Sequence, residues 1–248
     1  QLEGKNTVRE ALLANRKILE IILLNNHNDV VCNHIQQLAK EQKIPVKQVD
    51  RKKLDQMAQS HNHQGVIALV PPYQYAGLAD VLNACRDKKD TLFLILDGIE
   101  DPHNLGAILR SAEVFGATGV VIPKRRAAAV TPVVAKVASG ALEHVPVIQV
   151  PNITETIKTL KKHGFWIAGG EGGSSVKVMD QDLTGPLGLV IGSEGKGMGR
   201  LVKEQCDYLV SIPMSGKTGS LNASVAAGIL LYEISRQRIE SHASEGAR

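Results

Sequence analysis

The sequence predicts an α/β protein whose larger part is built on a mainly parallel sheet. From residue 91 onward, short apolar runs alternate with segments of helical periodicity. This alternation is typical of parallel strands that are buried on both faces. Hydrophobic residues make up 43% of the 248 positions, which is enough to build a core in one large domain or two small ones. We therefore expect a sheet with helices on both faces.

The first 72 residues predict a separate, smaller α/β domain. Asp29 is placed to cap a helix, and Pro71 and Pro72 end the last strand, because proline cannot donate to a strand ladder. The expected elements are a helix at 6–14, a strand at 18–24, a helix at 29–42 and strands at 45–49 and 65–70. Residues 73–90 are expected to form a linker with a short helical piece, which places a domain boundary there.

Residues 91–248 predict the larger domain. The expected strands are 91–96, 119–123, 145–150, 165–168, 187–191 and 208–212, and the expected helices are 105–115, 132–143, 153–163, 198–206 and 221–238. The polar tail from residue 240 is expected to be frayed.

Composition limits the cellular compartment and the classes of binding partner that are expected for this protein. Cys32, Cys85 and Cys206 are far apart, so neither a disulfide framework nor a metal site is expected, and a reduced, cytoplasmic setting follows. The apolar runs are too short to span a bilayer, and the first residues lack the apolar core of a signal peptide. The net charge of +4 permits a polyanionic partner, whereas 3% aromatic residues argue against a base-stacking platform.

Three loops at the expected carboxyl edge of the sheet carry unusual polar residues, and ligands gather at this edge in such folds. In the first loop, Asn104 stands where a helix N-cap is expected, and Arg110 follows six residues later. A purely structural interpretation is a capped helix with a surface pair between Arg110 and Glu113, three residues apart.

The second loop, residues 192–199, contains four glycines and Glu194. Glycines after a strand indicate close approach of backbone to a ligand, although the pattern is not the dinucleotide fingerprint. The third loop resembles the end of a P-loop at 216–218, but Ser211 stands where that motif needs glycine. What remains there is a polar cluster of Ser220, Asn222 and Ser224, of which N-capping explains one member.

Other polar groups carry weaker signals. His61, His63 and His103 are expected to be solvated or bonded within loops. The basic run Lys124, Arg125 and Arg126 follows a strand, and it predicts either a solvated loop or a contact with phosphate.

Together the three loops resemble the signature motifs of the SpoU (TrmH-type) RNA ribose 2′-O-methyltransferases of the SPOUT superfamily. The matching stretches are Asn104-Leu-Gly-Ala-Ile-Leu-Arg110-Ser-Ala, Leu189-Val-Ile-Gly-Ser-Glu194-Gly-Lys-Gly, and Ile212-Pro-Met followed by Ser220-Leu-Asn-Ala-Ser224. The segments at 4–8 and 63–68 resemble the accessory RNA-binding domain of that family, which has a ribosomal-protein-like fold. Within that family, the sequence resembles the bacterial 23S rRNA guanosine 2′-O-methyltransferases.

The resemblance implies a trefoil knot in the C-terminal segment, S-adenosyl-L-methionine as cofactor, a homodimer and RNA as partner. By position, it implies cofactor binding at Gly170, Gly192, Ile212, Met214 and Leu221. It implies catalytic roles at Asn104, Arg110, Glu194, Ser220 and Asn222. Arg110 is the family's proposed base, but an arginine holds its proton so firmly that pairing with a phosphate beside the target ribose is an equally consistent role.

Alternative functions stay open at this point. The substrate could be tRNA rather than 23S rRNA, and a protein of this fold could bind RNA without catalysis, for instance as a ribosome-assembly factor. An unrelated nucleotide-dependent α/β enzyme is a third possibility, disfavoured by the missing fingerprints.

Overall fold

The computed structural model describes residues 1–25, 29–59 and 62–246. The chain forms two compact units, one made of Gln1–Gln74 with Ala129–His144, and the other of Tyr75–Ala128 with Val145–Arg248. The contacts of the folded chain thus group residues 129–144 with the first unit. The domain boundaries expected from the sequence stay a prediction.

The first unit contains a four-stranded sheet with strand order β1-β4-β2-β3, in which β2 and β3 are parallel and the other pairs antiparallel. Its strands are β1 (Leu2–Glu3), β2 (Glu20–Leu24), β3 (Val46–Val49) and β4 (Val66–Leu69). Its helices are α1 (Lys5–Leu13), α2 (Val30–Glu41) and α3 (Arg51–Met57). Asp29 caps α2 as predicted, through hydrogen bonds from the amides of Val31 and Cys32. The sequence reading missed β1 and α3.

The inserted segment supplies α6 (Pro132–Ala138) and the short helix η1 (Ala141–Glu143) to the first unit. One continuous helix over 132–143 was expected, but Ser139 (φ 51°) and Gly140 (φ 99°) are left-handed and end α6. Gly140 is tightly placed, since a Cβ atom there would lie 2.4 Å from the side chain of Glu10. An ion pair of 2.6 Å between Arg16 and Glu143 also holds this segment.

The second unit contains a six-stranded, wholly parallel sheet with strand order β10-β8-β9-β5-β6-β7, which confirms the predicted fold class. Its strands are β5 (Leu92–Asp97), β6 (Gly119–Pro123), β7 (Val147–Val150), β8 (Trp166–Gly170), β9 (Leu187–Gly192) and β10 (Tyr208–Val210). The trefoil knot and the ribosomal-protein-like character of the first unit stay predictions.

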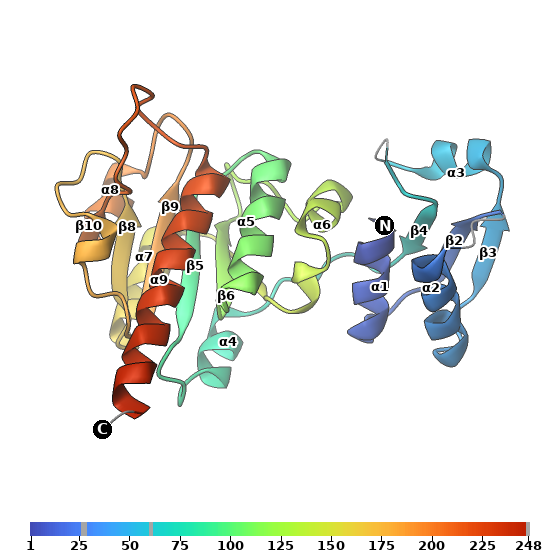
Figure 1. Cartoon of the computed structure of the whole chain (residues 1–248), viewed down its shortest axis with the longest axis horizontal. Coiled ribbons are helices and arrows are strands. Elements are labelled where there is room, and N and C mark those ends of the chain that lie inside the picture. Colours follow the sequence, from blue (N-terminus) through green and yellow to red (C-terminus); the bar gives the residue numbers. More distant parts are fainter. Residues whose placement is uncertain (26–28, 60–61, 247–248) are drawn as a thin grey trace. The chain divides into compact units, whose positions relative to one another are not determined.

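Helices cover both faces of this sheet. On one face α5 (Pro102–Val114) and α9 (Ala223–Gly246) lie side by side (Figure 1). On the other face the core includes residues of α4 (Leu78–Ala84), α7 (Ile153–Lys162) and α8 (Arg200–Lys203), packed on Phe93 and Val190. The helix α4 therefore contributes to the core of the second unit, although its sequence falls within the expected linker. A short 3₁₀ helix, η2 (Val178–Asp180), follows β8.

Two helices differ in length from the prediction. The helix α8 covers four residues instead of nine, because Gly199 precedes it and its amide is held by Asp97 Oδ2 at 2.7 Å. The helix α9 begins at Ala223 and continues to Gly246, so the tail up to residue 246 is helical and not frayed. Arg236 pairs with Glu240 at 2.6 Å, and His242 lies 2.9 Å from Asp90. Residues 247–248 lie outside the described part.

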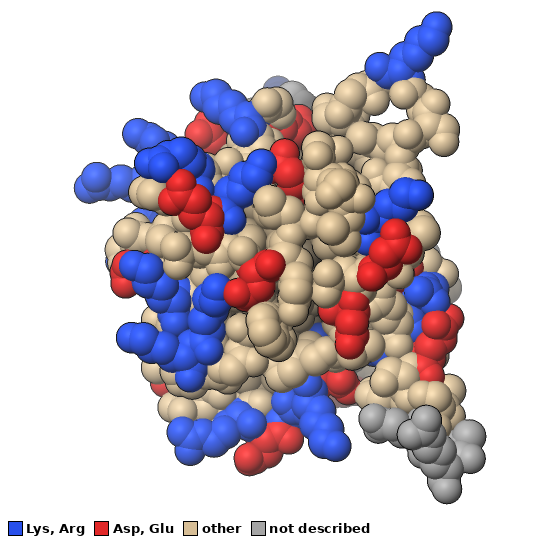
Figure 2. All heavy atoms as spheres, turned by 90° about the vertical axis from the view of Figure 1, so that its left-hand side faces the viewer, with Lys and Arg blue, Asp and Glu red and all other residues tan. Residues whose placement is uncertain are grey.

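The β10 edge of the sheet has a mixed surface. Lys and Arg side chains gather there with Asp and Glu between them (Figure 2). Lys161 pairs with Asp207 at 2.6 Å, and Lys203 pairs with Glu171 at 3.3 Å. In the described part of the chain, no helix is both long and apolar enough to cross a membrane.

Candidate active site

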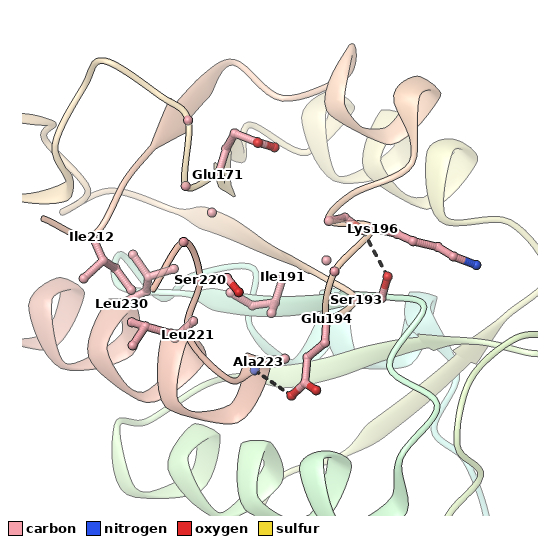
Figure 3. Close-up of a pocket in the computed structure, with 18 of the residues that line it drawn as sticks. Glu171, Ile191, Ser193, Glu194, Lys196, Ile212, Ser220, Leu221, Ala223 and Leu230 are labelled. Carbon is pink, nitrogen blue, oxygen red and sulfur yellow. Dashed lines mark hydrogen bonds between the residues drawn. The ribbon is translucent and has the colours of Figure 1, made fainter. Parts of the chain in front are cut away.

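The carboxyl edge of the parallel sheet contains a cavity of about 450 Å³ (Figure 3). The loops that follow β8, β9 and β10 enclose it together with the start of α9. All five residues expected at a cofactor site line it, namely Gly170, Gly192, Ile212, Met214 and Leu221. The expected catalytic residues Glu194 and Ser220 line it as well. Its volume lies in the range typical of small-molecule sites, about 300–1,000 Å³.

Gly192 ends β9 at a place where no side chain fits. A Cβ atom there would lie 2.2 Å from the carbonyl carbon of Gly197, because the loop folds directly back over the strand end. The fold-back is closed by two backbone hydrogen bonds between Ser193 and Gly197, of 3.1 and 2.9 Å. Gly195 and Gly197 have φ values of 76° and 66°, which glycine adopts without strain. This wall of the cavity is therefore mostly bare backbone.

Three of the expected catalytic residues meet beside this loop. Glu194 Oε1 accepts hydrogen bonds from Asn104 Nδ2 at 3.0 Å, from the Ala223 amide at 3.1 Å and, at a shorter distance, from Asn222 Nδ2. Asn222 Nδ2 also donates to Asn104 Oδ1 at 2.9 Å. We call Asn104, Glu194 and Asn222 the polar triad. It joins α5, the loop after β9 and the start of α9, which are far apart in the sequence.

Asn222 also caps α9. Its Oδ1 accepts from the amides of Ser224 (3.0 Å) and Val225 (3.3 Å) and from the Ser224 hydroxyl (2.6 Å). The carboxylate of Glu194 accepts a hydrogen bond from the amide of Ala223, the first residue of α9, at the positive end of the helix dipole. Capping thus explains Asn222 and Ser224, whereas Ser220 is left to the cavity.

The expected capping role of Asn104 is wrong. The N-cap of α5 is Asp101, whose side chain accepts from the His103 amide at 2.9 Å, and Pro102 occupies the first helical position. Asn104 lies within the first turn. Its side chain is therefore available to bind Glu194 and Asn222.

Arg110 is not part of the triad. It lies on α5 with an exposed side chain. Among the residues that the structure describes it makes no ion pair or side-chain hydrogen bond, so the expected surface pair with Glu113 is absent there. A guanidinium held free in this way is available to a partner from outside the protomer.

The sequence reading missed Glu171, which also lines the cavity (Figure 3). It follows β8 and is flanked by Gly170 and by Gly172 and Gly173, beside whose backbone there is open space. The run of glycines on both sides of one carboxylate was the available signal.

Nearby, burial and then the charge of Asp207 raise the pKa of the Cys206 thiol to about 11, so it stays protonated at neutral pH and is a poor nucleophile.

The described histidines considered as candidate ligands are not among the residues that line this cavity. His63 is buried; its Nδ1 accepts from the Gly65 amide of its own loop at 3.0 Å, and its Nε2 lies 2.7 Å from Oδ1 of Asp55 on α3. His103 is exposed, and His61 lies outside the described residues. Across the described ranges, no group of three or more His, Cys, Asp or Glu side chains could hold a metal ion.

The fold and the site define an α/β protein with a small-molecule cavity at the carboxyl edge of its parallel sheet, and comparison with known proteins gives the family. The sequence model of the SpoU rRNA Methylase family matches residues 91–232, and the model described as RNA 2′-O ribose methyltransferase substrate binding matches residues 1–76. The chain belongs to the SpoU rRNA methylase family. It is an RNA methyltransferase.

Individual relatives agree along nearly the whole chain. YacO of Bacillus subtilis (strain 168), described as a TrmH family tRNA/rRNA methyltransferase, is 50% identical over 236 residues, covering 95% of this chain and 94% of that protein. A TrmH-family protein of Staphylococcus haemolyticus is 47% identical with the same coverage. The SpoU methyltransferase AviRb of Streptomyces viridochromogenes is 26% identical with a TM-score of 0.82, covering 97% of this chain and 90% of AviRb. AviRb has also been solved with the cofactor AdoMet.

Proposed function

We propose that this protein transfers a methyl group from S-adenosyl-L-methionine to a ribose 2′-hydroxyl of RNA, at a guanosine of 23S rRNA in the cytoplasm. The observation that carries the proposal is the polar triad of Asn104, Glu194 and Asn222 beside a cavity walled by glycine backbone. AviRb, which shares the fold, binds AdoMet, and another solved relative is named an RNA 2′-O ribose methyltransferase.

The cavity suits this cofactor. Gly192 lets the loop after β9 fold closely back on the strand end, and open space beside Gly172 and Gly173 lets a flat purine approach main-chain hydrogen-bonding groups. Leu221 and Leu230 supply apolar surface, and Glu171 supplies an acceptor for hydroxyl groups. When bound, S-adenosyl-L-methionine supplies an electrophilic methyl group on a sulfonium. The residues that would hold it are Gly170, Gly192, Ile212, Met214 and Leu221.

The chain's own residues act by positioning. The three hydrogen bonds to Glu194 Oε1 fix the loop after β9 against α5 and α9, so the cavity wall is in place before RNA arrives. Preorganised geometry of this kind supplies much of the rate of a group transfer. Ser220, which is exposed at the mouth of the cavity, is available to orient the ribose.

Arg110 pairs with the phosphate beside the target ribose in this proposal. A guanidinium binds phosphate bidentately, and this pairing would orient the hydroxyl without asking arginine to release a proton. Because Arg110 stands apart from its own triad, we propose that the active site is completed in a homodimer. The exposed apolar residues of α5 and α9 support this assembly: Val114, Val225, Ile229 and Tyr232.

The proposal includes the trefoil knot. It is supported by the way in which segments 170–173, 191–197 and 210–230 all wall one cavity. In a trefoil knot the C-terminal end of the chain passes through an earlier loop, and this would bring these three segments together around one cavity.

The test is methyl transfer from labelled S-adenosyl-L-methionine to unmodified 23S rRNA and, in a parallel arm, to bulk tRNA. We expect ribose methylation of 23S rRNA, with activity lowered at least about a hundredfold in Arg110→Ala and Asn222→Ala, in line with the loss of positioning groups. Circular dichroism serves as the folding control. Transfer to tRNA alone would support the tRNA alternative, and cofactor-free RNA binding without transfer would support a non-catalytic role.

A further inference from the structure

A second hollow lies on the other side of the loop after β9. It is an open groove of about 900 Å³ that shares Ser193, Glu194, Lys196 and Gly197 with the cofactor cavity as a common wall. The loops after β5, β6 and β7 form its remaining sides together with α8 and with Asn104 at the start of α5. Figure 3 shows the Lys196 side chain pointing away from the cofactor cavity. The groove therefore adjoins the reacting centre without being part of the cavity.

The charges in this groove are not equivalent. Three of its four carboxylates already accept hydrogen bonds: Asp97 from the Gly199 amide (2.7 Å), Asp101 from the His103 amide (2.9 Å), and Glu194 within the triad. The fourth, Glu100, is exposed. The cations differ, because among the described residues only Arg200 of this groove has a carboxylate partner, Glu204 at 2.7 Å.

Arg125 and Arg126 are the free cations of the groove, together with Lys196. Both arginines are exposed, and within the described ranges neither forms an ion pair or a side-chain hydrogen bond. Their loop is nevertheless anchored, by Lys124 N to Val150 O (2.9 Å) and by Ala128 N to Ile99 O (2.8 Å). Two guanidinium groups are thus held on a short, fixed loop with no internal use.

Arg126 is also held in an unfavourable backbone conformation. Its φ of 57° is left-handed, a conformation that glycine adopts without cost and that is disfavoured for a residue with a side chain. Such strain is found at sites where the side chain is needed for function. Lys43 and Gln64 are left-handed as well, so what sets Arg126 apart is the combination of this conformation with a guanidinium at the groove that is unpaired in the described part of the chain.

We propose that Arg125 and Arg126 bind backbone phosphates of the RNA next to the target nucleotide, with the groove holding that stretch of the strand. The inference rests on the proposed function, since it assumes an RNA substrate. Arginine forks match phosphate oxygens, and contacts to phosphate fix the register of a nucleic acid without reading its sequence. The two residues act in positioning, separate from Arg110.

The test compares two double variants that each remove two positive charges. Arg125→Ala/Arg126→Ala removes them from the groove. Lys88→Ala/Lys89→Ala is the control, because these exposed lysines precede β5 and so lie toward the opposite edge of the sheet. The RNA is one that the wild-type protein methylates. Dissociation constants are measured for that RNA at several salt concentrations and for S-adenosyl-L-methionine by calorimetry.

We expect the groove variant to raise the KM and Kd for RNA about tenfold and to reduce the slope of log Kd against log salt by about 2, one for each lost phosphate contact. Cofactor affinity and the control variant should match the wild type. Unchanged RNA affinity in the groove variant, an equal loss in the control variant, or a parallel loss of cofactor affinity would each overturn the inference. Wild-type protein that methylates no RNA would instead refute the proposed function itself.

Arg126→Gly gives an independent readout. Glycine relieves the left-handed strain, so we expect a higher melting temperature together with weaker RNA binding. A variant with wild-type RNA affinity would show that the side chain has no role in binding. A purely structural arginine would give a lower melting temperature, which would equally contradict the proposal.

Discussion

At the scale of single residues, Gly192 has the strictest requirement in the cavity wall. We predict that Gly192→Ala weakens binding of S-adenosyl-L-methionine at least about tenfold, because a Cβ 2.2 Å from the Gly197 carbonyl carbon must push the loop aside. The obstacle is backbone and cannot rotate away. Calorimetric titration of the cofactor measures the effect.

Gly185→Ala is the matched control for this substitution. A Cβ at Gly185 meets nothing within 4 Å, and the residue needs no left-handed backbone. Its cofactor affinity should equal that of the wild type. If the Gly192 variant also binds normally, the loop is more yielding than its contacts indicate and bare backbone is not what admits the cofactor.

Residue identities at the site were more predictable from the sequence than their contacts. The three polar loops could be placed at one edge of the sheet because parallel strands bring their carboxyl ends together. The hydrogen bond from Asn104 to Glu194 joins residues 90 positions apart, which no local pattern reports. Asn104 was misassigned as a cap because α5 begins earlier, with Asp101 as its N-cap and Pro102 as its first residue.

At the scale of elements, errors arose where local signals were weak or where backbone ended a helix early. The helix α3 buries only Leu54, so it lacks an apolar stripe, although Asp50 was a readable cap. The helix α6 ends at the left-handed Ser139, a conformation that its sequence does not announce. The strong apolar strands, such as β5 and β9, were predicted to within one or two residues, because burial on both faces leaves a continuous signal.

The helix α9 extends beyond its apolar segment because Arg238 anchors it. The guanidinium is buried and donates to the carbonyl oxygens of Asp90 (2.8 Å), Thr91 (3.3 Å) and Gly185 (3.0 Å). Burial lowers the pKa of this group below its ordinary value, so the hydrogen bonds offset a real cost of desolvation. They tie α9 to the segments that enter β5 and β9.

We predict that Arg238→Met lowers the free energy of unfolding by about 2–4 kcal/mol, because it removes three hydrogen bonds made by a buried, charged guanidinium. Arg236→Met, two residues earlier on the same helix, should lower the free energy of unfolding much less, since it removes only solvent-screened pairs with Glu233 and Glu240. Denaturant titration of both variants gives the comparison. Equal losses would mean that the buried anchor contributes no more than surface charge.

At the scale of the whole molecule, the exposed apolar face of α5 and α9 indicates that a second chain packs there and completes the active site. Val114 is 65% exposed and Tyr232 is 57% exposed, although Tyr232 contacts Phe115 with ring centroids 6.2 Å apart. Large apolar side chains on neighbouring helices are typical of a surface that another chain covers. The apolar segment 221–234 is long enough to predict packing on a partner as well as on its own sheet, but the sequence could not show which side chains the sheet leaves uncovered.

We predict that Ile229→Glu/Tyr232→Glu converts a dimer into a monomer at micromolar concentration in sedimentation experiments, and that methyl transfer is lost with it. Two buried charges at an interface weaken association by about a hundredfold or more. Val30→Glu, at a residue that is 85% exposed on α2, is the matched control and should change neither property.

Mixing Arg110→Ala with Asn222→Ala protein then tests whether the site is shared. If subunits exchange freely, half of the dimers are mixed and each has one intact site, so about a quarter of wild-type activity should return. A mixture as inactive as its components would place Arg110 and Asn222 in the same subunit's site.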